Sequence, residues 1–131
     1  MDWVGTARSN YFAVKDRDAF NQAMQALDAR IVEHDSTAKV ALISTSDGGD
    51  WPDMDDEGED IDFPDLVASH LCDGEVAVFM CIGHEGNRYL TGVAIAVNAR
   101  GEQVLVSMGD IYECAAQAFG VAKSDISLAE Y

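Results

Sequence analysis

The residues with the clearest chemical potential are ten carboxylates in one stretch, "SDGGDWPDMDDEGEDIDFPD", at residues 46–65. The stretch contains no lysine and no arginine. Clustered carboxylates can bind a divalent cation, or they can form a solvated acidic loop. They can also present a negative surface that imitates a nucleic acid to a basic partner.

An EF-hand loop is the specific form that the cation interpretation would take. Such a loop needs oxygen ligands at positions 1, 3 and 5, Gly at 6, an apolar residue at 8 and a bidentate Glu at 12. For a loop that begins at residue 53, positions 1, 3, 5 and 6 are Asp53, Asp55, Glu57 and Gly58. Position 8 is Asp60 and position 12 is Pro64, so two requirements fail. We predict no calcium loop, although carboxylates at this density can attract divalent cations weakly through charge alone.

Cysteine and histidine do not form a convincing site. Cys81-x-x-His84 has the spacing of half a zinc site, but the sequence offers no second pair. We expect Cys81 in a strand and His84 in a hairpin turn, and therefore no shared ligand. Nucleophile elbow, phosphate loop and dinucleotide fingerprint are all missing from the sequence. We predict no catalytic residue, no metal ligand and no cofactor.

The three cysteines, Cys72, Cys81 and Cys114, are odd in number and irregular in spacing, which argues against a disulfide framework. They are typical of a reducing compartment. No apolar run is suited to a signal peptide or to a membrane span. We therefore expect a cytoplasmic protein without a membrane partner.

The net charge narrows the choice of partner. The chain carries 24 acidic and 8 basic residues, a formal charge of −16. Such a field repels nucleic acid and attracts basic surfaces with fast, salt-sensitive association. Direct binding of DNA or RNA is disfavoured because no basic patch could neutralise phosphates.

The first part of the chain predicts a strand, a helix and a hairpin. A length of 131 residues with 48% hydrophobic residues predicts a single α+β domain, residues 1–131. "NYFAVK", residues 10–15, has strand composition. Asp16 is a candidate N-cap for an amphipathic helix at 18–29. "RIVEH" and "KVALIST" then predict a hairpin whose turn is "DSTA", residues 35–38.

The second part follows an acidic loop at about 46–62, which Gly48, Gly49 and Pro52 break. Asp62 as N-cap and Pro64 in the first turn predict a short helix at 64–71. Three β-rich runs at 75–83, 88–97 and 102–108 predict an antiparallel meander. A capping box of Asp110 and Glu113 predicts a helix at 111–119 that stops at Gly120. The expected order is β-α-β-β-α-β-β-β-α, with helices on one face of an antiparallel sheet.

Two motifs carry a resemblance. "TARSNYF" at 6–12 and "RYLTG" followed by Ile95 look like small proteins of bacterial phages, plasmids and integrated mobile elements. The acidic character is similar to that of antirestriction and anti-CRISPR inhibitors. The resemblance implies a class of inhibitor and transfers no individual residue. Within the first motif, Arg8 and Tyr11 could form a contact surface, or Arg8 could pair with an acid of the same chain and Asn10 could form a turn.

If the acidic stretch imitates a nucleic acid, specific residues should contact the partner. The expected partner-binding set is Trp51 together with Asp53, Asp55, Asp56, Glu57, Glu59, Asp60 and Asp62. At ~3.3 Å per extended residue, seven carboxylates over ten residues give one charge per about 4.7 Å, near the ~3.4 Å of a single nucleic-acid strand. The interleaved apolar residues Trp51, Met54, Ile61 and Phe63 could pack on the domain or meet the partner.

The leading hypothesis is therefore an acidic protein that binds and inhibits or regulates a basic enzyme that handles nucleic acid. The alternative is a small interaction module in which the sheet or the last helix forms a homodimer. An enzyme with an unrecognised pocket, or a divalent-cation binder, would be less consistent with these patterns.

Overall fold

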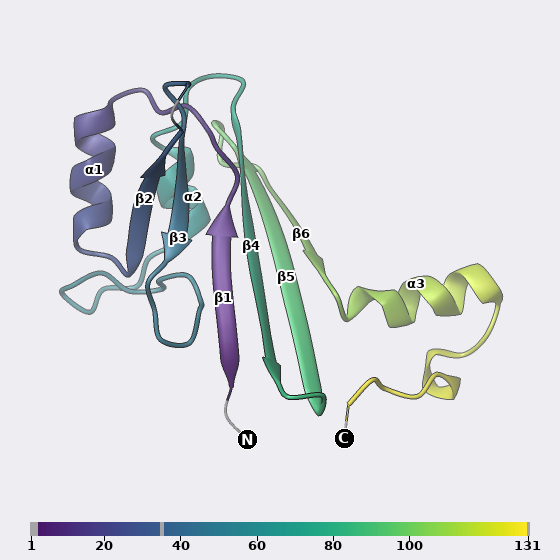
Figure 1. The fold of residues 1–131 in the computed structure, drawn as a ribbon. Helices are drawn as coiled ribbons and strands as arrows, with labels where there is room; N and C mark the ends of the chain where they lie inside the picture. The colour runs from purple at the N-terminus through teal and green to yellow at the C-terminus, as the bar shows by residue number, and fades with distance from the viewer. Residues whose placement is uncertain (1–2, 35, 131) are drawn as a thin grey trace.

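The computed structural model describes residues 3–34 and 36–130, and within them six strands form one antiparallel sheet (Figure 1). The strand order is β2-β3-β1-β4-β5-β6. The elements are β1 (Val4–Ser9), α1 (Arg17–Gln25), β2 (Ala29–Glu33), β3 (Val40–Ser44), α2 (Phe63–Ala68), β4 (Val76–Glu85), β5 (Tyr89–Asn98), β6 (Gln103–Ser107), α3 (Asp110–Phe119) and the 3-10 turn η1 (Lys123–Asp125). The predicted α+β class and element order are confirmed. The predicted turn at 35–38 includes Asp35, which lies outside the described residues.

The core lies between one face of the sheet and the helices α1 and α2. Phe20 of α1 and Phe63 of α2 belong to one buried cluster with Leu42 and Phe79 of the sheet. Burying a side chain of this size contributes about 1.5–3 kcal/mol, so these contacts fix both helices on that face. Among the described residues no helix covers the opposite face of the sheet, and we call it the open face.

Both covering helices begin at the predicted caps. The Asp16 carboxylate accepts from the amide of Ala19 at 3.1 Å, and the Asp62 carboxylate accepts from the amide of Asp65 at 3.2 Å. Both helices are shorter than predicted. α1 ends at Gln25 instead of residue 29, because Ala29 already pairs with Ser44 at the start of β2.

The first strand is displaced from its predicted position. A strand over residues 10–15 was expected, but the strand is Val4–Ser9 and each of its residues pairs with β4. The prediction was wrong because residues 4–9 alternate between the two faces of the sheet: Thr6 and Arg8 point to the open face, while Ala7 and Ser9 are buried on the other face. Asn10 ends the ladder, since its side chain donates to the Val76 carbonyl and accepts from the Val78 amide.

The last helix does not pack on the sheet. α3 projects beyond the edge strand β6 and contacts the turn η1 and the tail (Figure 1). It ends at Gly120 in the left-handed region, as predicted. The predicted capping box is wrong, because Gly109 is the N-cap and the carboxylate of Asp110 accepts from the amide of Ser107 at 2.9 Å. That bond holds the turn by which the chain leaves β6.

Candidate interaction surfaces

The acidic loop, residues 53–62, is folded on itself. The amide of Asp55 donates to the carbonyl of Glu59 and the amide of Ile61 donates to the carbonyl of Asp53, both at 2.9 Å. Gly58 closes the tip with a positive φ of 81°, a conformation that glycine adopts without strain. The loop therefore has its own hydrogen-bonded frame.

Two of the seven predicted carboxylates are used to build this frame. Oδ1 of Asp55 accepts from the amides of Glu57 and Glu59, each at 2.9 Å. Asp62 caps α2 and also accepts from the side-chain amide of Gln103 at 3.4 Å. Asp62 therefore has the capping role that the sequence predicted, whereas the structural role of Asp55 was not visible in the sequence pattern.

The other five carboxylates face solvent. They are Asp53, Asp56, Glu57, Glu59 and Asp60. Within residues 3–34 and 36–130, none of these five side chains has a hydrogen-bond or ion-pair partner. Their charges are therefore unneutralised by the rest of the described chain.

Apolar residues attach the loop to the core. Trp51 stacks on Phe63 with ring centroids 5.3 Å apart and meets Phe79 edge-on at 5.4 Å. Ile61 also packs against the core cluster, whereas Met54 is 52% exposed. Trp51 was predicted to bind a partner, and that remains a prediction; its half-buried ring is turned toward the core, where its Nε1 is buried without a hydrogen-bond acceptor among residues 3–34 and 36–130. Packing on the domain is thus the observed role of Trp51, Ile61 and Phe63.

Residues 48 and 49, which precede the acidic loop, contact β1 and the residue before it. The Gly48 carbonyl accepts from the indole Nε1 of Trp3 at 3.1 Å. Gly49 has a φ of +73°, and a Cβ there would overlap the backbone of Gly5. Beside it, burial and then the negative charge of Asp50 raise the pKa of the Cys81 thiol. This thiol is therefore poorly suited to act as a nucleophile at neutral pH.

The pair Cys81 and His84 does not form half of a metal site. His84 lies in β4 and pairs with Leu90, so its predicted place in the turn was wrong. Residues three apart in a strand point to opposite faces, which separates the two side chains. Nor does any group of three or more His, Cys, Asp or Glu side chains that could hold a metal ion occur in the part of the chain that the structure describes.

Arg8 lies on the open face. Its Nε donates to the Ser9 carbonyl at 3.0 Å, and its guanidinium lies 5.9 Å from the centre of the Tyr11 ring. Among the described acidic residues none forms an ion pair with Arg8, so the expected internal pairing is not observed. Its exposed position leaves it available to a partner.

The open face belongs to the sheet that the sequence offered as a possible dimer contact, but the sequence did not indicate which residues would form the surface. Exposed apolar side chains run across β4 and β6, among them Met80 and Ile82 on β4 and Val104 and Val106 on β6. A shallow groove between these strands is lined by Met80, Ile82, Gly92, Val93, Ala94, Val106, Ser107 and Met108. The signal was present in the sequence: "VAVFMCI", "VAIAV" and "VLV" are continuously apolar, whereas a sheet with one solvated face alternates.

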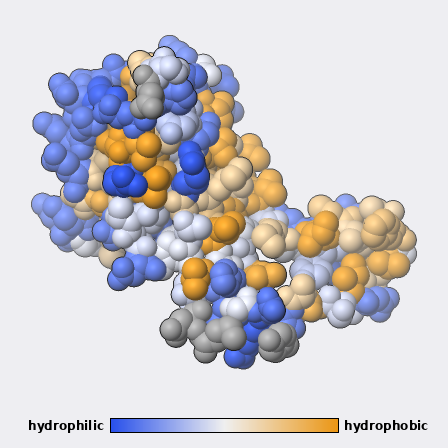
Figure 2. Space-filling view, viewed as in Figure 1, coloured by the Kyte–Doolittle hydropathy of each residue, from blue (hydrophilic) through white to orange (hydrophobic). Residues whose placement is uncertain are grey.

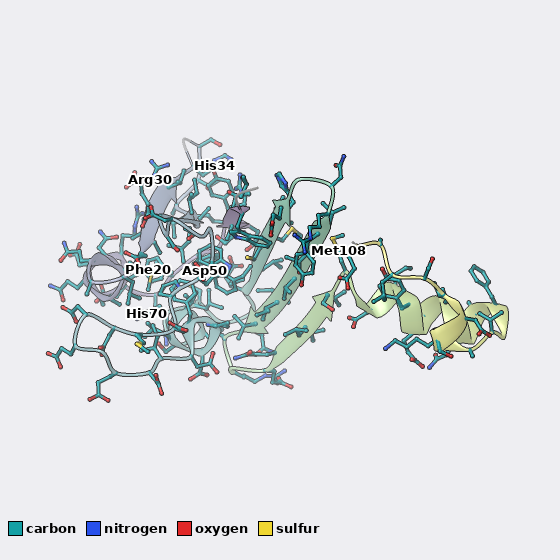
Figure 3. The ribbon with its side chains drawn as sticks, turned by 90° about the horizontal axis from the view of Figure 1, so that it is seen from below. Phe20, Arg30, His34, Asp50, His70 and Met108 are labelled. Atoms are coloured by element: carbon teal, nitrogen blue, oxygen red, sulfur yellow. The ribbon has the colours of Figure 1, made fainter. Side chains whose placement is uncertain are left out.

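Figure 2 shows where these residues gather. Hydrophobic side chains lie over the strands and along α3, whereas hydrophilic side chains dominate the opposite end around α1. Figure 3 places Met108 at the start of the segment that carries α3, far from Phe20 and His70. The molecule therefore has a hydrophilic end around α1 and a more apolar end at the strands and α3.

No family model, curated protein or solved structure matches this chain. Among the described residues, no helix combines the length and the apolar character needed to cross a membrane.

Proposed function

We propose that this chain is a non-catalytic binding protein whose acidic loop occupies a basic surface of an enzyme that handles nucleic acid, and so inhibits or regulates that enzyme. The observation that carries the proposal is the set of five unpaired carboxylates on a loop anchored by Trp51 and Phe63. A defence or replication enzyme of a bacterial host is the partner that the sequence resemblance suggests.

The frame of the loop matters for this function. A mobile acidic segment would lose conformational entropy on docking, whereas a loop with its own hydrogen bonds and aromatic anchors has less to lose. Clustered exposed carboxylates also accelerate encounter with a cationic groove, and this effect weakens as salt screens the charges. The shallow hollows of the open face are lined mainly by apolar side chains, which favours binding over catalysis.

A charge-neutralised variant provides the test. It carries Asp53→Asn, Asp56→Asn, Glu57→Gln, Glu59→Gln and Asp60→Asn, and leaves the structural Asp55 and Asp62 intact. The matched control neutralises five exposed carboxylates elsewhere: Asp18, Asp28, Asp73, Asp125 and Glu130. Both variants change the net charge equally, so they separate position from total charge.

Tagged wild-type, loop variant and control are used to capture proteins from a bacterial lysate at low salt, followed by elution at high salt. We expect wild-type and control to retain the same basic nucleic-acid enzyme and to release it with salt. With the purified partner, the loop variant should bind at least about tenfold more weakly, roughly 1.4 kcal/mol. Equal binding by the loop variant would refute a role for the acidic loop.

A second candidate function is a homo-oligomeric interaction module without mimicry. The apolar open face favours it, because a patch of this kind on a free monomer is uncommon.

A further inference from the structure

The edge strand β6 is apolar on both of its faces. Val104, Leu105 and Val106 are 65%, 62% and 58% exposed. The first and third pair with Ala96 and Ala94 and lie on the open face, whereas Leu105 pairs with Ile95 and points to the other face. One edge of β6 also has no neighbouring strand. An apolar, unpaired edge of this kind is a site where another chain associates.

The open face beside β6 carries no negative charge. Along the described strands no Asp or Glu occupies this face, although the chain contains 24 acidic residues. Its charged residues are Arg8 and Arg30. Met80, Ile82 and Met108 are each more than half exposed along the groove. Depletion of charge at an apolar centre is the composition of a protein interface.

The helix α3 carries a second apolar surface. Ile111 is 62% exposed, and Phe119, seven residues after Tyr112 and on the same side of the helix as that residue, is 77% exposed. Ile111, Cys114 and Ala118 are all exposed and share one side of the helix at spacings of three and four. The other side faces the tail, where the hydroxyl of Tyr112 accepts from the amide of Ala129 at 2.7 Å. α3 thus projects from the domain with an apolar side that its own sheet does not cover (Figure 1).

We propose that the occupant of the open face is a second copy of this chain, with α3 of each copy lying across β4–β6 of the other. The chain supplies both halves of the contact, an apolar groove and a projecting apolar helix. A two-fold axis lets each copy place its helix in the groove of the other, because in such an interface residue i of one copy meets residue j of the other and j meets i.

The size of the surface fits this assignment. The exposed apolar side chains of β4–β6 on the open face and of α3 together present on the order of 800 Å², comparable with the about 800 Å² per partner of a standard stable interface. Single patches on free monomers are typically a few hundred Å². Burying this surface therefore suits a permanent contact.

The distribution of charge favours a second copy as well. The charged residues of α3 are Asp110 and Glu113, opposite in sign to Arg8, which lies on β1 and pairs with Met80 at the border of the groove. The tip of the acidic loop lies at the other end of the sheet, beyond β2 and β3 and away from β6 and α3 (Figures 1 and 3). Two chains of charge −16 can therefore meet at β6 with their acidic loops far apart.

Sedimentation of the full chain tests the assembly. We expect wild-type protein at about 10 µM, a concentration above the Kd of a stable interface, to sediment at twice the chain mass of 14.1 kDa. The double variant Ile82→Glu, Val106→Glu should sediment as a monomer with an unchanged circular dichroism spectrum, since both side chains are exposed in the single chain. The matched control Met54→Glu charges an equally exposed apolar residue outside the surface and should remain dimeric. A wild-type monomer, or a dimeric double variant, overturns the proposal.

Disulfide trapping tests the arrangement without depending on a destabilising change. Cys72 and Cys81 are replaced by Ser, and Met80→Cys is added while the native Cys114 of α3 is kept. Mild oxidation should link Cys114 of one copy to position 80 of the other and give a dimer band without reductant. Met54→Cys in the same background is the control and should give much less. Failure of the position-80 variant to cross-link, or a cross-link within one chain, refutes the exchange of α3. Neither result depends on the acidic loop, so this proposal and the proposed function can fail separately.

Discussion

Trp51 is predicted to anchor the acidic loop, and Trp51→Ala measures how strongly. The half-buried indole removes on the order of 100 Å² of apolar surface from water, worth about 2.5 kcal/mol at ~25 cal/mol per Å². Its contacts with Phe63 and Phe79 add about 0.5–1.5 kcal/mol each. Removing the buried, unpartnered Nε1–H returns about 1–3 kcal/mol. We expect a net loss of about 2–3 kcal/mol.

The comparison with Trp51→Phe sharpens this prediction. Phenylalanine is smaller than tryptophan and loses some ring contact, but it has no N–H to leave unsatisfied. The loss of contact and the relief of the buried N–H therefore nearly cancel. We expect Trp51→Phe to lie within about 1 kcal/mol of wild type. Met54→Ala, at a residue that is 52% exposed on the same loop, should change stability by less than about 0.5 kcal/mol.

Urea unfolding gives the three free energies, and hydrogen exchange shows where the change acts. In Trp51→Ala the amides of Glu57, Glu59 and Ile61 should lose protection, because they depend on the loop's internal hydrogen bonds. The reasoning is refuted if Trp51→Ala is as stable as wild type, or if those amides keep their protection while stability falls.

Three further predictions concern the cap, the turn and pH. Asp62→Ala should cost about 1 kcal/mol in urea unfolding, because alanine has no oxygen to accept from the first turn of α2. Asp62→Asn should cost much less, because asparagine keeps an acceptor oxygen; equal losses would contradict this. Gly49→Ala should destabilise the fold by more than about 2 kcal/mol, because overlap with Gly5 adds to the ~1–2 kcal/mol of left-handed strain, whereas Gly58→Ala has a similar φ and open space and should cost only the strain. Thermal unfolding of the two variants measures this difference, and similar losses would argue against the close approach of Gly49 to Gly5. Burial, and then the charge of Lys15, lowers the pKa of His70 below 6.5, so the unfolded chain takes up this proton first as pH falls. His70 should therefore contribute to stability above about pH 6.5 and lose that contribution on acidification, and His70→Gln should flatten this part of the profile measured between about pH 7.5 and 5.

Local patterns in the sequence predicted much of the fold. The caps Asp16 and Asp62, the stop at Gly120 and the β4–β6 meander all follow from interactions between residues close in sequence. Helical spacing and turn chemistry encode such features directly. For the same reason the α+β class followed from the order of the elements.

Long-range pairing decided the features that the sequence left open. The first strand took residues 4–9 because β4 supplied the partner, and no local pattern marks that register. Asp55 holds the loop together through its own hydrogen bonds, although nothing in the sequence distinguishes it from the neighbouring acids. Trp51 faces the core, although in the sequence it stands within the acidic stretch. The composition determined that the chain is strongly negative. The hydrophobic runs determined that it forms this sheet. Only the tertiary structure placed the acidic loop at one end and uncovered apolar strands with a projecting α3 at the other, because the separation of these two surfaces depends on which distant segments pack together.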